Sequence, residues 1–226
     1  VAARLEGPDG ILAGAAGGAV FADCTSGDPA TSQAIAARFA ERGIAFIDAP
    51  VSGGTSGAEQ GTLTVMVGGD AAALERARPV LEAFGKKIVH CGGIGAGDAV
   101  KAMNNAMLAI HVWSTGECLA ALAKAGVSPQ VALDVINASS GRSNTSMNLF
   151  PERVLSRAFP RTFRLALLDK DIGIAAQVAR EQKVVSPLLQ LAAELMRMAH
   201  AELGEEADHV EAVQVIERLS NTEIRA

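Results

Sequence analysis

The sequence predicts an α/β protein in which a partial parallel-sheet domain is followed by an all-helical domain. Two observations carry this prediction. Before residue 97, short apolar runs alternate with amphipathic segments, as in the βα units of a parallel sheet. After Gly97, apolar residues recur at helical spacing almost to the C-terminus, and strand alternation is lost. We therefore expect a sheet domain over residues 1–94 and a helical domain over residues 95–226, joined by a long helix.

Local signals place the elements of the sheet domain. Asp28 can cap a helix that runs to Arg42, and Pro29 suits its first turn. A second helix is expected from Asp70 to Phe84. The apolar runs between and beside these helices predict four strands: Ala19–Asp23, Ile44–Asp48, Leu63–Val67 and Lys87–His90.

The helical domain begins with an unusually long apolar pattern. We expect one helix from about Asp98 to about Ala125, because the run Gly126–Pro129 then breaks the pattern and begins another helix. No repeat or low-complexity linker separates the two domains. Their junction is therefore expected to be packed rather than flexible.

Composition excludes several classes of function. The 226 residues carry a net charge of −5 with scattered basic residues, so no nucleic-acid partner is expected. The apolar stretch from Ile11 to Ala22 is too short to span a bilayer, so no membrane partner is expected. The three cysteines are far apart and the four histidines show no ligand spacing. We expect no disulfide framework, no metal site and a cytoplasmic protein.

Two glycine-rich segments are candidate binding loops. Gly93–Gly97 follows a strand and opens a helix, but its third glycine comes one residue too early for the G-x-G-x-x-G dinucleotide fingerprint. A tight connection between domains is the better interpretation. Ser52, Gly53 and Gly54 follow an apolar strand at the edge where α/β sheets bind ligands. They can hold a carboxylate, or the glycines can simply permit a turn.

Lys101 and Asn105 lie four residues apart near the start of the long helix, so they share one face. A lysine there can exchange a proton with a hydroxyl or carbonyl oxygen, and an asparagine can orient a substrate. On spacing alone, an ordinary solvated lysine is the commoner interpretation.

Several blocks together resemble the β-hydroxyacid dehydrogenase family, which includes the 3-hydroxyisobutyrate dehydrogenases. The blocks cover essentially the whole chain, in the family's order and spacing. They are Asp48–Thr55 (DAPVSGGT), Gly61–Gly69 (GTLTVMVGG), Gly92–Asn105 with its Gly-x-x-Gly-x-Gly-x-x-x-Lys-x-x-Asn-Asn pattern, and Phe163–Asp171 (FRLALLDKD). The resemblance implies a Rossmann-like sheet domain followed by an all-α domain, and a cleft between them.

The resemblance also implies roles for individual residues. Lys101 would be the catalytic acid/base, and Ser52, Gly53, Gly54 and Asn105 would bind the substrate. Cofactor contacts would come from Ser26 after the first strand and from Lys170 in the helical domain, with Asp171 orienting Lys170. Phosphogluconate dehydrogenases carry a histidine where this chain has Asn104, and imine reductases replace the lysine, so both activities are disfavoured.

One departure from the family concerns the cofactor. Its members carry a glycine fingerprint about ninety residues before the serine-glycine-glycine turn, but here that turn is already at Ser52. We therefore expect the GxGxxG portion and the residue that selects NAD or NADP to lie outside this chain.

The predicted function is hydride transfer between NAD or NADP and a small 3-hydroxy acid or its semialdehyde, such as 3-hydroxyisobutyrate or tartronate semialdehyde. A homodimer or homotetramer is expected. Arg142, in the turn Ser139–Asn144, can pair with a second anionic group on the substrate or can be a solvated charge. The alternative function is that of an inactive, truncated remnant that acts as a helical dimerisation module.

Overall fold

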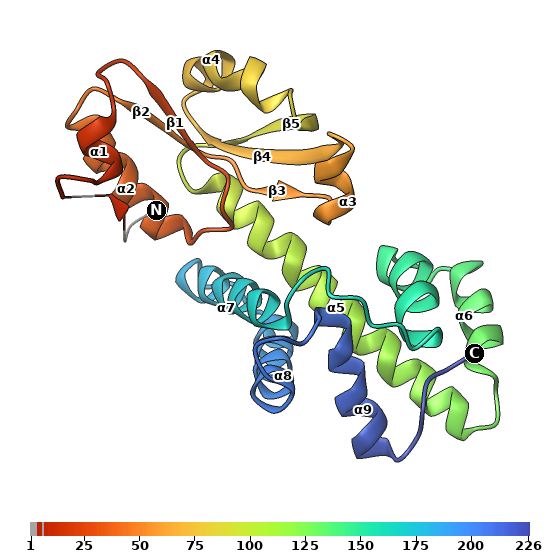
Figure 1. Cartoon of the computed structure of the whole chain (residues 1–226). Helices are drawn as coiled ribbons and strands as arrows, with labels where there is room; N and C mark the ends of the chain where they lie inside the picture. Colours follow the sequence, from red (N-terminus) through yellow and green to blue (C-terminus); the bar gives the residue numbers. More distant parts are fainter. Residues whose placement is uncertain (1–3, 6) are drawn as a thin grey trace. The chain divides into compact units, whose positions relative to one another are not determined.

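The computed structural model describes residues 4–5 and 7–226, and it divides into two compact units, residues 1–102 and 103–226. The first unit contains the sheet and the second is helical, which confirms the predicted fold class (Figure 1). One helix, α5 (Ala96–Lys124), begins in the first unit and ends in the second. The division between the units therefore falls inside a helix rather than in a loop.

The sheet unit follows the predicted order of elements, with three short additions, β3, α1 and α3. Its strands are β1 (Val20–Asp23), β2 (Ala45–Asp48), β3 (Val51–Ser52), β4 (Leu63–Gly69) and β5 (Gly85–Gly92). Its helices are α1 (Ile11–Gly14), α2 (Pro29–Ala40), α3 (Gly54–Glu59) and α4 (Ala71–Leu81). Asp28 and Asp70 cap α2 and α4 by accepting hydrogen bonds from backbone N–H groups, as the sequence predicted for Asp28.

The sheet is mixed, whereas the sequence predicted parallel pairing throughout. β1 pairs with β2 in parallel, and β4 pairs with β5 in parallel. β4 is antiparallel to both β2 and β3, which pair with successive parts of one of its edges. The reversal arises because β2, β3 and β4 follow one another without a long crossover helix between them, and such short connections join antiparallel strands.

Side-chain alternation on β2 divides the core of this unit between the two faces of the sheet. Phe46 packs with Phe39 of α2 and with Phe21, and these rings lie 4.7 to 5.9 Å apart. The next residue, Ile47, packs on the other face with Leu74 and Leu81 of α4. The sheet is therefore covered by α2 on one face and by α4 on the other.

The second unit contains the rest of α5 and the helices α6 (Pro129–Asn137), α7 (Leu165–Glu181), α8 (Pro187–Leu203) and α9 (Ala212–Ser220). A π-helix, η2 (Thr145–Leu155), and a short 3₁₀ helix, η3 (His209–Glu211), complete it. The buried carboxylate of Asp208 accepts hydrogen bonds from the backbone N–H groups of Thr162 and Phe163, at 2.7 and 2.9 Å. These bonds fix the segment that leads into α7.

Helix α5 is long and apolar enough to cross a membrane if length and composition are the only criteria. Its most apolar 18-residue window has a mean hydropathy of 1.3, and 44% of that window is buried inside the protein. Core helices of soluble proteins meet the same criteria. The helix also carries Asp98, Lys101 and Asn105, all of them buried, within its first ten residues.

Candidate active site

Ser52, Gly53 and Gly54 form the junction between β3 and α3. Ser52 ends the strand, and the two glycines have φ angles of 139° and 64°, which lie in the region that other residues rarely adopt. A side chain at Gly53 would also lie 2.8 Å from a methyl carbon of Leu63. The backbone conformation therefore favours glycine at both positions, and the contact with Leu63 adds to this at Gly53.

The first turn of α5 is anchored by a carboxylate from the sheet. Asp48, fully buried at the end of β2, accepts hydrogen bonds from the backbone N–H groups of Gly95 at 2.7 Å and Asp98 at 3.0 Å. These are N–H groups that a helix start leaves without partners of its own. A Cβ at Gly97 would lie 2.3 Å from the carbonyl oxygen of Met66, so the turn packs directly on β4. Close packing accounts for this glycine.

A second carboxylate, that of Asp98, is buried on α5 beside the loop that follows β1. It accepts hydrogen bonds from the backbone N–H of Gly27 at 3.0 Å and from the hydroxyl of Ser32 at 2.6 Å. Burial raises the pKa of Asp98 from 3.8 to about 6. The two hydrogen bonds oppose this rise, and the nearby carboxylates Asp48 and Asp23 add to it.

Lys101 lies one turn beyond Asp98 and is buried, with 8% of its surface exposed. This differs from the solvated lysine that a helix position alone suggests. Asn105, one further turn along, is also buried, and its amide nitrogen donates a 2.6 Å hydrogen bond to Asp171 of α7. A buried lysine and a buried asparagine therefore follow each other on one helix.

Asp171 connects two of the predicted site residues. One of its carboxylate oxygens accepts the bond from Asn105, and the other lies 2.7 Å from the ammonium nitrogen of Lys170. Asp171 is buried, whereas the Lys170 side chain is 43% exposed. The sequence predicted Asp171 as the partner of Lys170, and the structure adds its bond to Asn105.

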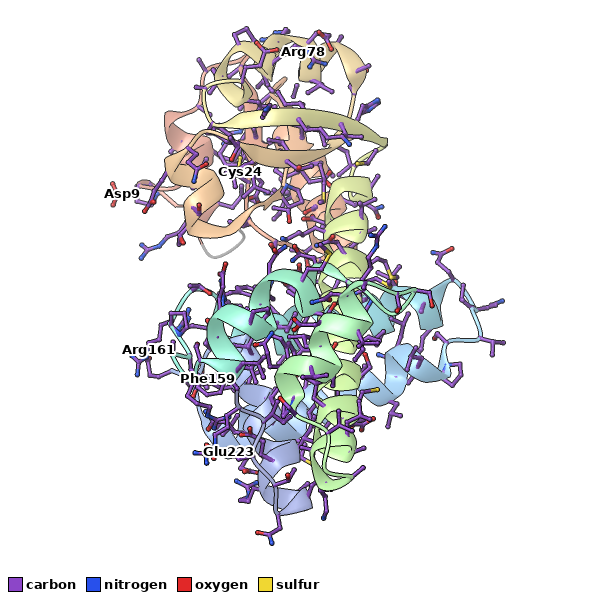
Figure 2. All side chains as sticks on the ribbon, turned by 90° about the vertical axis from the view of Figure 1, so that its right-hand side faces the viewer. Asp9, Cys24, Arg78, Phe159, Arg161 and Glu223 are labelled. Atoms are coloured by element: carbon purple, nitrogen blue, oxygen red, sulfur yellow. The ribbon has the colours of Figure 1, made fainter. Side chains whose placement is uncertain are left out.

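The loop after β1 carries Ser26, the residue predicted to contact the cofactor. Cys24, labelled in Figure 2, begins this loop, and the hydroxyl of Thr25 donates a 2.7 Å hydrogen bond to Asp23. Burial, with a smaller contribution from Asp23, raises the pKa of the Cys24 thiol. Ser26 is half-buried between Thr25 and Gly27.

Two further points from the sequence analysis concern Arg142 and metal ligands. Arg142 lies in the exposed turn after α6. Among the described residues, no three histidine, cysteine or acidic side chains gather as metal ligands would.

The residues present suit one end of a dinucleotide. β1 and β2 are adjacent parallel strands, and ligands of open α/β sheets bind beyond the carboxyl ends of such strands. The hydroxyls of Thr25 and Ser26 follow the carboxyl end of β1 and are of the type that bonds a nicotinamide ribose. The sequence contains no G-x-G-x-x-G segment to hold the pyrophosphate.

Comparison with known proteins defines the class of protein to which this chain belongs. Residues 1–93 match the family model described as the NAD binding domain of 6-phosphogluconate dehydrogenase. Residues 95–216 match the one described as NAD-binding of NADP-dependent 3-hydroxyisobutyrate dehydrogenase. Both belong to NAD(P)-dependent oxidoreductases.

Individual proteins similar to this chain are dehydrogenases of hydroxy acids. The chain is 38% identical to 2-(hydroxymethyl)glutarate dehydrogenase of Eubacterium barkeri, over 97% of the chain and 73% of that protein. It is 39% identical to 3-hydroxyisobutyrate dehydrogenase of Pseudomonas aeruginosa, over 88% and 69%. The structure of Mycobacterium tuberculosis 3-hydroxyisobutyrate dehydrogenase with L-serine superposes with a TM-score of 0.83 at 32% identity, covering 91% of this chain and 72% of that one.

The chain belongs to the β-hydroxyacid dehydrogenase family, a family of oxidoreductases that use NAD or NADP. This membership confirms the resemblance drawn from the sequence blocks. It also supports the dehydrogenase interpretation over that of a helical dimerisation module.

Sequence reasoning missed Asp48 and Asp98 as organising residues of the site. A signal was present, since Asp23 and Asp48 both end apolar strands and Asp98 lies in the first turn of a helix. The partners of Asp48 and Asp98 are backbone N–H groups and the Ser32 hydroxyl, 47 to 71 residues away along the chain. No local sequence pattern predicts such bonds.

Proposed function

We propose that this chain carries the catalytic machinery of an NAD(P)-dependent dehydrogenase that acts on a small 3-hydroxy acid or its semialdehyde, such as 3-hydroxyisobutyrate or tartronate semialdehyde. The observation that carries the proposal is the buried pair Lys101 and Asn105, one helical turn apart on α5. A lysine at a buried helix position can exchange a proton with a substrate oxygen away from bulk water, and an amide one turn along can orient that oxygen. These two side chains therefore suit an acid/base role for Lys101.

Lys101 is the acid/base of the proposed reaction. When the alcohol is oxidised, the lysine Nζ accepts the hydroxyl proton, and when the aldehyde is reduced it returns a proton to the carbonyl oxygen. The bound nicotinamide supplies the acceptor or donor of hydride. Asn105 orients the substrate oxygen next to Lys101, because Asp171 holds its amide in one orientation.

The remaining contacts bind the two reactants. Ser52, Gly53 and Gly54 bind the substrate carboxylate through the serine hydroxyl and backbone N–H groups. Ser26 contacts the cofactor, and Lys170, oriented by Asp171, also contacts it. Support for these assignments comes from the matching family blocks and from the conformation of the two glycines.

Domain roles, location and assembly complete the proposal. Residues 1–94 would form a dinucleotide-binding domain, and residues 95–226 a substrate and dimerisation domain. Three free cysteines suit the reducing cytoplasm. Exposed apolar side chains on α8, such as Leu188 and Leu191, suit a homodimer or homotetramer.

The test compares lysine variants of the full-length protein. Lys101→Ala should lower turnover by roughly two to four orders of magnitude with little change in cofactor affinity. Lys101→Met, which keeps most of the buried volume, should do the same. The control Lys87→Ala removes an exposed lysine of β5 and should leave turnover unchanged. If a Lys101 variant keeps more than a third of wild-type turnover, Lys101 is not the acid/base.

A further inference from the structure

The Asp98 carboxylate joins two segments that the proposed function assigns to different tasks. Its two oxygens accept hydrogen bonds from the Gly27 backbone N–H, in the loop after β1, and from the Ser32 hydroxyl, in the first turn of α2. Asp98 itself lies in the first turn of α5, three residues before Lys101. One side chain thus connects the loop that carries Ser26 to the helix that carries the acid/base.

Gly27 lies close against the Asp98 carboxylate. A Cβ added at Gly27 would lie 2.9 Å from one Asp98 oxygen and 3.2 Å from the other. Close by, a Cβ at Gly95 would lie 3.0 Å from the carbonyl oxygen of Pro29, so the turn before α5 packs equally closely on the start of α2. The position of the loop is therefore sensitive to the side chain at position 98.

The contacts made by Asp98 require two polar atoms rather than a charge. Asp98 is 1% exposed, it shares its surroundings with the carboxylates of Asp48 and Asp23, and none of the causes of its pKa shift is a cation. An asparagine could make the same two contacts without burying a charge, because its amide oxygen can accept from Gly27 and its amide nitrogen can donate to the Ser32 oxygen. The two hydrogen bonds, and not the charge, are therefore what holds the loop, and the first turn of a helix is a favourable place for the carboxylate that makes them.

We infer that Asp98 is a positioning residue for the cofactor: it holds the Ser26–Gly27 loop against the first turn of α5, at a fixed distance from the turn that carries Lys101. This inference rests on the proposed function, in which Ser26 contacts the cofactor. Asp98 itself touches neither reactant. Its loss should therefore weaken cofactor binding far more than it slows the chemical step.

The experiment compares Asp98→Ala, Asp98→Asn and the wild type in the full-length protein. For Asp98→Ala, the KM for the nicotinamide cofactor should rise at least about tenfold, since two hydrogen bonds to a charged group are lost. The KM for the hydroxy acid should stay within about twofold and kcat within about threefold. Asp98→Asn should restore the cofactor KM to within about threefold of the wild type, because it retains both bonds.

Amide hydrogen exchange of the segment 24–32, measured without ligands, supplies a readout that does not depend on turnover. Asp98→Ala should lose protection in this segment, and Asp98→Asn should keep it. Ser32→Ala removes one of the two hydrogen bonds to Asp98. It replaces Asp98→Ala in the test if that variant does not fold. It should raise the cofactor KM about threefold.

The outcomes separate the inference from the proposed function. If the wild type does not oxidise or reduce hydroxy acids, the proposed function is wrong, and hydrogen exchange still decides whether Asp98 holds the loop. If the wild type is active, an unchanged cofactor KM in Asp98→Ala overturns the inference. So does a variant in which kcat falls while the exchange of residues 24–32 is unaltered.

Discussion

Replacing Asp98 by asparagine should change how the stability of the sheet unit depends on pH. The pKa of Asp98 is about 6 in the folded protein and has an ordinary value of 3.8. A group whose pKa is raised on folding contributes stability below its unfolded pKa and loses it as the pH rises through its folded pKa. The wild type should therefore lose stability relative to Asp98→Asn between pH 4 and pH 6.

The magnitude follows from the pKa difference. Each tenfold change in the ionisation equilibrium corresponds to about 1.4 kcal/mol, so a rise from 3.8 to about 6 amounts to about 3 kcal/mol. Burial is the main cause of the rise, and Asp48 and Asp23 contribute in the same direction. Other carboxylates titrate in this range too, but their contributions largely cancel in the difference between the two proteins.

The assay is the free energy of opening of residues 1–102, measured by amide hydrogen exchange at a series of pH values and constant ionic strength. Fluorescence is unsuitable because the single tryptophan, Trp113, lies in the other unit. Asp134→Asn, which alters an exposed carboxylate of α6, is the control and should show no such trend. A wild type that gains stability relative to Asp98→Asn as the pH rises, or a flat difference, would refute the reasoning.

Three further variants test other parts of the structure. Ser52→Ala should raise the KM for carboxylate substrates by roughly tenfold with little effect on kcat, and an unchanged KM would count against a carboxylate contact. Lys170→Ala should weaken cofactor affinity, measured by titration calorimetry; equal affinity and equal turnover would leave Lys170 as a surface charge. Gly97→Ala should destabilise the protein by several kcal/mol, because its methyl group would lie 2.3 Å from the Met66 carbonyl oxygen. The control Gly173→Ala, in an open position on α7, should instead stabilise it by about 0.5 to 1 kcal/mol, as denaturant unfolding can show.

The parts of the fold predicted from the sequence are those fixed by local signals. Asp28 and Pro29 begin α2, and the run Gly126–Pro129 ends α5 and begins α6, as predicted. The apolar run Ile44–Asp48 also predicted the strand β2, which spans Ala45–Asp48. Each of these signals acts within a few residues of the chain, so the sequence shows it directly.

The features that sequence analysis missed depend on contacts between distant segments. β3 has only two residues, and it is a strand because Val51 and Ser52 meet Val65 and Thr64 of β4. Alternation does not reveal strand direction, so the antiparallel pairing of β4 was not predicted. The burial of Lys101 likewise depends on the packing around α5, whereas the spacing of Lys101 and Asn105 was visible in the sequence.

The continuity of α5 limits which insertions and substitutions this protein can accept. The division between the two units falls between Lys101 and Asn105, yet the interval between these residues is set by helical backbone hydrogen bonds, about 6 Å along the axis. Mutations can therefore change the length or the residues of loops in either unit without altering the spacing of Lys101 and Asn105. Substrate preference can shift through such loop changes. A single residue inserted between the two would instead turn one side chain about 100° away from the other.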